Sequence, residues 1–150
     1  MRLSAHGVDV DVPPGWEVRI VRRGVVAFGE QPRPVVHVAN FPLPEHRGDF
    51  GAGVVEAMGG RDVFVVLFEY EPASSRQPLF RHHGLPRLAP ADFDPRRLQR
   101  TLPRQAGAQR FFSSGGRAFC LYTVVADVRN VPVAASQVNN VLARLRIVPS

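Results

Sequence analysis

The stretch DVFVVLFEY, residues 62–70, constrains the fold more than any other part of the sequence, because both of its faces are apolar. Alternate residues of an extended chain point to opposite sides of a sheet. A strand that is apolar on both sides therefore lies inside a sheet that is covered above and below. The apolar side chains are Val63, Val65 and Leu67 on one face and Phe64, Val66, Phe68 and Tyr70 on the other.

The later stretch FFSSGGRAFCLYTVV, residues 111–125, has the pattern of a β-hairpin. Residues 108–113 and 117–127 are strand-like, and the Ser-Gly-Gly sequence between them is a connection of hairpin length. Since the strands arrive mostly as hairpins, we expect a mainly antiparallel central sheet of about six or seven strands. Alternating patterns and turn residues predict the other short strands at residues 3–5, 8–12, 16–20, 25–28 and 35–41.

Three segments, residues 49–59, 94–103 and 132–145, have the boundary residues and apolar spacing of helices. The first begins at a capping residue, Asp49, and ends at a glycine, and the second begins with Asp94 followed by proline. The third has the most regular helical spacing. Together with the double-faced strands, these segments predict an α+β protein, a three-layer α/β/α sandwich with about three short helices.

A chain of 150 residues fits a single globular domain, residues 1–150, with a sufficient core. A long loop rich in arginine and proline is expected around residues 72–104, where apolar periodicity is lost. The first residues lack the apolar run of a signal peptide, and no stretch approaches the about 20 apolar residues of a membrane span. We therefore expect a cytoplasmic protein without a membrane span.

The basic charge is concentrated in one segment of the chain. All 19 residues counted as Lys+Arg are arginine, which is typical of the coding bias of high-GC bacteria. Residues 76–117 contain nine arginines and two aspartates, a net charge of +7, whereas the remaining residues contain ten arginines and eleven acidic residues. Arginine side chains bind carboxylates and phosphates, so this segment predicts an acidic partner.

Three features resemble the Mog1/PsbP-like group of small domains. They are the PPGW turn after a short strand pair, the late hairpin FFSSGGRAFCLYTVVAD, and the terminal helix-plus-strand VNNVLARLRI. The resemblance implies an antiparallel sheet between helices and a mostly non-catalytic adaptor, assembly or lipoprotein-like domain. It carries over no functional residue, and the arginine- and proline-rich residues 72–103 have no counterpart expected in that group.

Ser113, Ser114 and Cys120 are the candidate nucleophiles of the hairpin. A nucleophile elbow or a phosphate loop needs a helix after the turn, and here the chain continues into a strand. A catalytic triad also needs a positioned histidine and acid, which the sequence does not supply beside the serines. Cys120 lies between apolar neighbours, as inert core thiols do. We predict structural roles for all three, no catalytic residue and no cofactor.

The histidines do not form a metal-binding pattern. His82 and His83 are adjacent in a loop, so their side chains point to opposite sides. His37 lies on a predicted strand, with His46 beyond it. A histidine pair without nearby cysteine or carboxylate is a poor ligand set, and we predict solvated loop histidines rather than a metal site.

The leading hypothesis is a non-catalytic protein-interaction or assembly module that binds an acidic protein partner through the arginine-rich surface. The alternatives are a polyanion-binding protein, for which nucleic acid is the example, and a small-ligand-binding protein or enzyme with a pocket beside the sheet. A solvated surface in an arginine-biased protein also explains the charge, and a homo-oligomer is compatible with every one of these hypotheses. The candidate partner-binding residues are Arg81, Arg87, Arg96, Arg97, Arg100 and Arg104.

Overall fold

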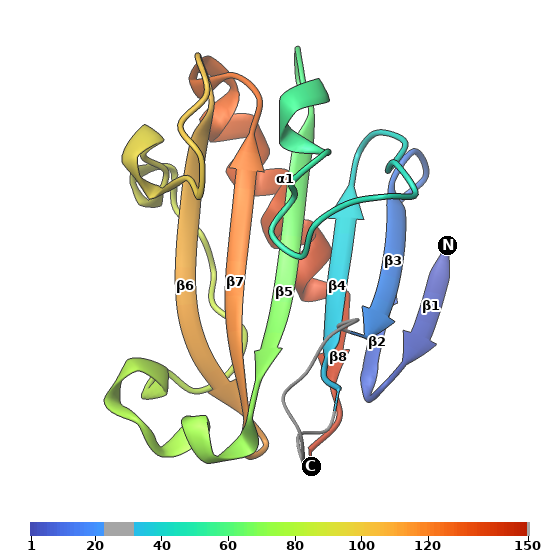
Figure 1. The fold of residues 1–150 in the computed structure, drawn as a ribbon, viewed down its shortest axis with the longest axis vertical. Helices are drawn as coiled ribbons and strands as arrows, with labels where there is room; N and C mark the ends of the chain where they lie inside the picture. Colours follow the sequence, from blue (N-terminus) through green and yellow to red (C-terminus); the bar gives the residue numbers. More distant parts are fainter. Residues whose placement is uncertain (23–31, 150) are drawn as a thin grey trace.

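Within residues 1–22 and 32–149, which the computed structural model describes, eight strands form two antiparallel sheets (Figure 1). The predicted strand at residues 25–28 lies outside these residues. The smaller sheet has the order β1-β2-β8, with bounds Arg2–Ala5, Val8–Asp11 and Leu145–Ile147. The larger sheet has the order β3-β4-β5-β7-β6, with bounds Glu17–Arg22, Pro34–Ala39, Val63–Tyr70, Arg117–Val125 and Ala106–Ser114.

The hairpin predicted at residues 111–125 is confirmed. Strands β6 and β7 pair in antiparallel register from Ala106↔Val125 to Ser114↔Arg117. Only Gly115 and Gly116 connect them, with φ of 56° and 80°. Two successive positive φ angles give the tight turn whose twist matches that of the strands, and glycine adopts this backbone without steric cost.

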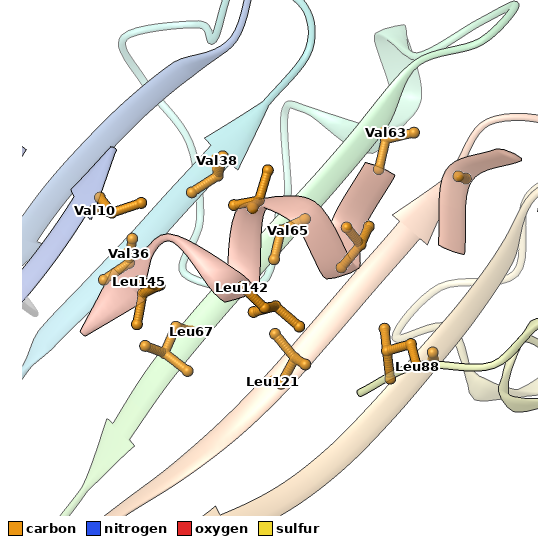
Figure 2. Close-up of a cluster of buried hydrophobic side chains, with 14 of the residues drawn as sticks. Val10, Val36, Val38, Val63, Val65, Leu67, Leu88, Leu121, Leu142 and Leu145 are labelled. Carbon is orange, nitrogen blue, oxygen red and sulfur yellow. The ribbon is translucent and has the colours of Figure 1, made fainter. Parts of the chain in front are cut away.

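The C-terminal helix, α1 (Val131–Ala143), covers one face of the larger sheet, as Figure 2 shows. Pro132 lies in its first turn, where a missing N–H costs nothing. Leu142 of the helix and Leu121 of the sheet belong to one apolar cluster, which Val10 of the smaller sheet extends. The predicted C-terminal helix is thus confirmed, and the smaller sheet helps α1 to cover this face.

The opposite face of the larger sheet is covered by irregular chain rather than by helices. Phe64, Phe68 and Tyr122 on this face form a second apolar cluster. Phe41, Leu43, Phe50 and Met58 pack on this cluster from one covering segment, and Leu98 and Leu102 pack on it from another. The prediction that β5 is buried on both sides is confirmed.

The predicted three-layer α/β/α sandwich, with one central sheet of about six or seven strands and three helices, is wrong. The described chain is mostly β, with two sheets of three and five strands and one α-helix. Residues 49–59 contain only the 3-10 helix Val55–Ala57, and residues 94–103 only the 3-10 helix Pro95–Arg97. Gly51, with φ of 98°, interrupts the first segment. Helices shorter than about 12 residues form only where packing supports them, and each of these segments is close to that limit or below it.

Arg117, the first residue of β7, connects the two sheets. Its guanidinium donates to Glu69 of β5 at 2.9 and 2.7 Å, and the two side chains are only 8% and 1% exposed. Its other N–H groups donate to the backbone carbonyls of His6 and Gly7, in the β1–β2 turn, and of Val148, after β8. All five donors of the guanidinium are used, so Arg117 has a structural role.

The long arginine- and proline-rich segment meets the outer edge of β6 near the two ends of this strand. Between them it passes over the α1 face of the sheet, where Leu88 is buried (Figure 1). Near one end of β6, Ser113 N–H donates to the carbonyl of His82, and near the other end Asp94 and Gly107 exchange two backbone hydrogen bonds. The segment therefore covers the two ends of an edge strand that would otherwise be open to another chain. Its 3-10 helices are Pro72–Arg76, Pro78–Phe80, Pro90–Asp92 and Pro95–Arg97.

Candidate ligand-binding cavity

A cavity of about 280 Å³ lies on the sheet face opposite α1, between residues 48–56 and residues 98–105. Its apolar wall consists of Phe50, Val55, Leu98 and the ring of Tyr122, together with Ala52. At about 30 Å³ per water molecule, this volume suits a ligand of roughly ten non-hydrogen atoms. Apolar walls with a few fixed polar groups are typical of small-molecule sites.

The wall formed by residues 48–56 is anchored to the sheet through Phe50. The Phe50 ring stacks on Phe68 with centroids 4.8 Å apart, and it meets Tyr122 edge-on at 5.8 Å. Aromatic pairs in these geometries stabilise beyond their buried area. The ring therefore holds an irregular segment against the sheet without a helix.

Tyr122 of β7 places a hydroxyl group in the cavity wall. The hydroxyl oxygen accepts a hydrogen bond from the backbone N–H of Gln99 at 2.7 Å, which fixes the facing segment. Burial raises the pKa of Tyr122, so the phenol keeps its proton near neutral pH. Since no acceptor for that proton occurs among the described residues, the hydroxyl group can donate a hydrogen bond to a ligand.

Gln105 contributes a second polar group to the wall. Its side-chain amide donates to the carbonyl of Val55 at 2.7 Å, which links the two walls of the cavity. The amide oxygen is buried and has no donor among the described residues. An unsatisfied buried acceptor costs about 1–3 kcal/mol, and such groups are usually satisfied by bound water or a ligand.

Charged groups occur at the mouth of the cavity. Arg100 and Glu56 form an ion pair of 3.3 Å across it, with side chains 67% and 37% exposed. Hydrogen bonds from the backbone N–H groups of Glu56 itself and of Gly53, together with Arg100, lower the pKa of Glu56. Asp49, from the same wall as Glu56, is the other charged lining residue.

A buried histidine supports the wall that carries Asp49 and Glu56. His37 of β4 is 1% exposed, and its Nε2 lies 2.8 Å from the carbonyl oxygen of Asp49. Arg47 donates from Nε to Nδ1 of His37 at 2.7 Å. Because Nδ1 accepts, the ring proton resides on Nε2 and is donated to Asp49, so this network requires a neutral histidine. His37 lies on a strand, as predicted, whereas the prediction of solvated side chains concerned the loop histidines.

We expect the stability of the protein to fall below about pH 6.5 because of His37. Burial is the main cause that lowers its pKa from 6.5, and the positive charge of Arg47 acts in the same direction. Unfolding lets the imidazole take up a proton. The free energy of unfolding is therefore fully retained above pH 6.5 and falls, by at most about 1.4 kcal/mol per pH unit, as the pH drops toward the folded-state pKa.

Urea unfolding of the His37→Gln variant between pH 5 and 6.5 checks this prediction. The free energy of unfolding of the variant should change less with pH than that of the wild type. His82→Gln, at an exposed histidine, is the matched control, and its free energy of unfolding should depend on pH as that of the wild type does. Parallel pH profiles for the wild type and His37→Gln would contradict the assignment.

The six arginines predicted to bind a partner are all exposed, but they do not lie on one surface. Leu85 and Phe93 pack on the α1 side of the sheet and Leu98 on the opposite side, so the segment passes around the edge of β6. Arg96 pairs with Asp94 at 3.0 Å and Arg100 with Glu56, whereas the other four have no carboxylate partner among the described residues. Binding of an acidic partner stays a prediction.

Ser113 has the histidine neighbour that the sequence did not predict. Its hydroxyl oxygen lies 2.9 Å from Nδ1 of His83. Ser113 is 3% exposed, and its backbone is bonded on both sides to residues 82–84. No carboxylate hydrogen-bonds to His83 among the described residues. The pair therefore links the long segment to β6. This structural role explains the Ser113–His83 contact without a nucleophilic serine.

The remaining candidate residues have structural positions. Cys120 is fully buried, as predicted, and burial raises the pKa of its thiol to about 11. In the part of the chain that the structure describes, no three histidine, cysteine or acidic residues are grouped to hold a metal ion. No helix among those residues has the length and apolar character to cross a membrane.

Sequence reasoning missed the cavity and most of its lining residues. Tyr122, Gln99, Gln105 and Glu56 were not predicted to share a site. One signal was present, since the Tyr122 hydroxyl in the middle of a buried strand needs a hydrogen-bond partner. The sequence did not reveal that this partner comes from residue 99.

Comparisons of this chain with protein-family models, curated proteins and solved structures gave no match. The resemblance to the Mog1/PsbP-like group therefore stays a prediction.

Proposed function

We propose that this protein binds a small, largely apolar molecule in the cavity between residues 48–56 and 98–105. The observation that carries the proposal is a cavity of about 280 Å³ with apolar walls and a few polar groups held at fixed positions. Tyr122 belongs to a central strand of the larger sheet, so the site has a rigid base. Contacts from Phe50 and Gln105 hold the two irregular walls in place.

Binding is favoured over catalysis by the protonation states of the lining groups. An efficient general acid or base has a pKa near the operating pH. The raised pKa of Tyr122 keeps it a neutral hydrogen-bond donor, and the lowered pKa of Glu56 keeps it an ionised partner of Arg100. These two groups are suited to hold and orient a ligand.

The proposal is tested with 2-phenylethanol, a neutral probe of nine non-hydrogen atoms that matches the cavity volume. Titration of the ¹⁵N-labelled protein should shift the backbone amide signals of Gln99, Arg100 and Gln105. Ala52→Trp, which places an indole in the cavity, should abolish these shifts. Ala57→Trp, at an exposed alanine of the same segment outside the cavity, is the matched control and should retain them.

Amide shifts that are scattered over the surface, or that persist unchanged in Ala52→Trp, would contradict the proposal. Both tryptophan variants are first compared with the wild type by urea unfolding. A destabilised Ala52→Trp is replaced by Leu98→Phe, which reduces the cavity from the opposite wall, so the outcome does not depend on one variant.

A further inference from the structure

We propose that the ligand is a small zwitterion with an apolar side chain, in which an ammonium and a carboxylate group lie on neighbouring atoms, as in an α-amino acid. This inference rests on the proposed function and identifies the class of ligand. The sign and the placement of the charged groups at the mouth of the cavity point to this class of ligand.

The charges of the mouth are divided between its two walls. Asp49 and Glu56 come from residues 48–56, and Arg100 comes from residues 98–105. Among the described lining residues, one wall is therefore acidic and the other basic. A ligand lying across the mouth meets a negative surface on one side and a guanidinium on the other.

The Glu56–Arg100 ion pair can open, so that each of its two side chains binds a charged group of the ligand instead. Nη1 of Arg100 lies 3.3 Å from Oε1 of Glu56, and both side chains are accessible to solvent. Exposed ion pairs of this kind contribute little to stability, so separating this pair costs little. Arg100 can then present two parallel N–H groups to a carboxylate, which is the geometry that guanidinium recognition favours.

Ligands with only one charge are poorly matched to this mouth. A simple carboxylate that binds Arg100 also approaches Glu56, which lies 3.3 Å from Arg100, and like charges repel at that range. A simple amine that binds Glu56 approaches Arg100 in the same way. A zwitterion gives each side of the separated ion pair a new partner of opposite sign. Charge complementarity of this kind is a source of specificity at binding sites.

The interior of the cavity defines the rest of the ligand. Phe50, Leu98 and Tyr122 surround a volume that fits a side chain of the size of leucine or phenylalanine. The charged lining residues are Asp49, Glu56 and Arg100, so no charge is needed on the part of the ligand that enters between the apolar walls. The expected ligand thus has its charges at the mouth and an apolar group inside.

Four probes that share a phenyl group test the inference by calorimetry and amide titration: 2-phenylethanol, 3-phenylpropanoate, 2-phenylethylamine and L-phenylalanine. L-Phenylalanine should bind about tenfold more tightly than each singly charged probe, which is the effect of one additional charge-assisted hydrogen bond. Arg100→Gln and Glu56→Gln should each remove most of this advantage. The loss is measured as the ratio of the affinities for L-phenylalanine and 2-phenylethanol in each variant.

Arg97→Gln is the matched control, because Arg97 is an exposed arginine of the same segment that does not line the cavity. It should bind all four probes as the wild type does. Equal affinities for the four probes, with amide shifts at the cavity, would overturn the zwitterion inference and leave the proposed function intact. Tighter binding of 3-phenylpropanoate or 2-phenylethylamine than of L-phenylalanine would also overturn the inference. No binding of any probe would overturn the proposed function as well.

Discussion

Replacing Arg117 with methionine should lower the free energy of unfolding by about 3–5 kcal/mol, because it leaves the buried carboxylate of Glu69 without a partner. The same substitution removes the donors for three backbone carbonyls, which belong to the β1–β2 turn and to the residues after β8. The smaller sheet would then be held to the larger one by apolar contacts alone at this position. Urea unfolding measures the loss directly.

Arg110→Met is the matched control for Arg117→Met. Arg110 also lies in the hairpin and pairs with Asp92 at 3.2 Å, but its side chain is 37% exposed. Partly exposed ion pairs contribute at most about 1 kcal/mol, so this variant should remain close to the wild type. Adding Glu69→Leu to Arg117→Met should recover part of the loss, because the unpaired charge is gone. A stability of Arg117→Met within about 1 kcal/mol of wild type would contradict the structural role of the pair.

The second large effect is expected for Gly51→Ala, in the wall of the cavity. Gly51 has φ of 98°, and a Cβ atom at this position would lie 2.7 Å from Cε2 of the buried Phe64 ring. The backbone conformation and the collision together should lower the free energy of unfolding by about 2–3 kcal/mol. Because the segment must move away from the sheet, the affinity for 2-phenylethanol should fall as well.

Gly59→Ala separates this effect from the general cost of replacing a glycine. Gly59 follows in the same covering segment and has no positive φ, and a Cβ atom at this position would meet no atom beyond its chain neighbours within 4 Å. Its substitution should change stability by less than about 1 kcal/mol, and a small gain is expected from the reduced freedom of the unfolded chain. Similar losses in the two variants would show that the wall is not held against Phe64.

The regular part of the fold was predictable because local patterns determine it. Val63 to Phe68 alternate between two apolar faces, Gly115 and Gly116 have the chemistry of a tight turn, and the residues after Pro132 follow helical spacing. Each of these signals acts over a few residues. The predicted strands and the terminal helix therefore agree with the structure wherever it describes them.

The covering layer opposite α1 was not predictable in the same way. The residues after Asp49 and after Asp94 carry correct helix-start signals, yet packing on the sheet by Phe50 and Leu98 holds them in irregular conformations. Tertiary contacts override weak local preferences when a segment is short. The prediction that helices would cover both faces was wrong for this reason, although the need for two covering layers was correctly inferred.

The candidate site was hidden because it depends on contacts between distant parts of the chain. Glu56 and Arg100 are 44 residues apart, and Gln105 bonds to a carbonyl 50 residues earlier. No spacing rule links such residues. The sequence prediction for this part of the chain was based on its arginines. The residues that build one wall of the cavity there include Leu98, Gln99 and Gln105, which carry no charge.

A crystal structure of the protein determined with saturating 2-phenylethanol tests the central claim most directly. We expect the phenyl ring between Phe50 and Leu98, over the ring of Tyr122, with residues 48–56 and 98–105 in place around it. A probe bound only elsewhere, or a space between these segments filled by the protein's own side chains, would contradict the claim that this cavity is a ligand site.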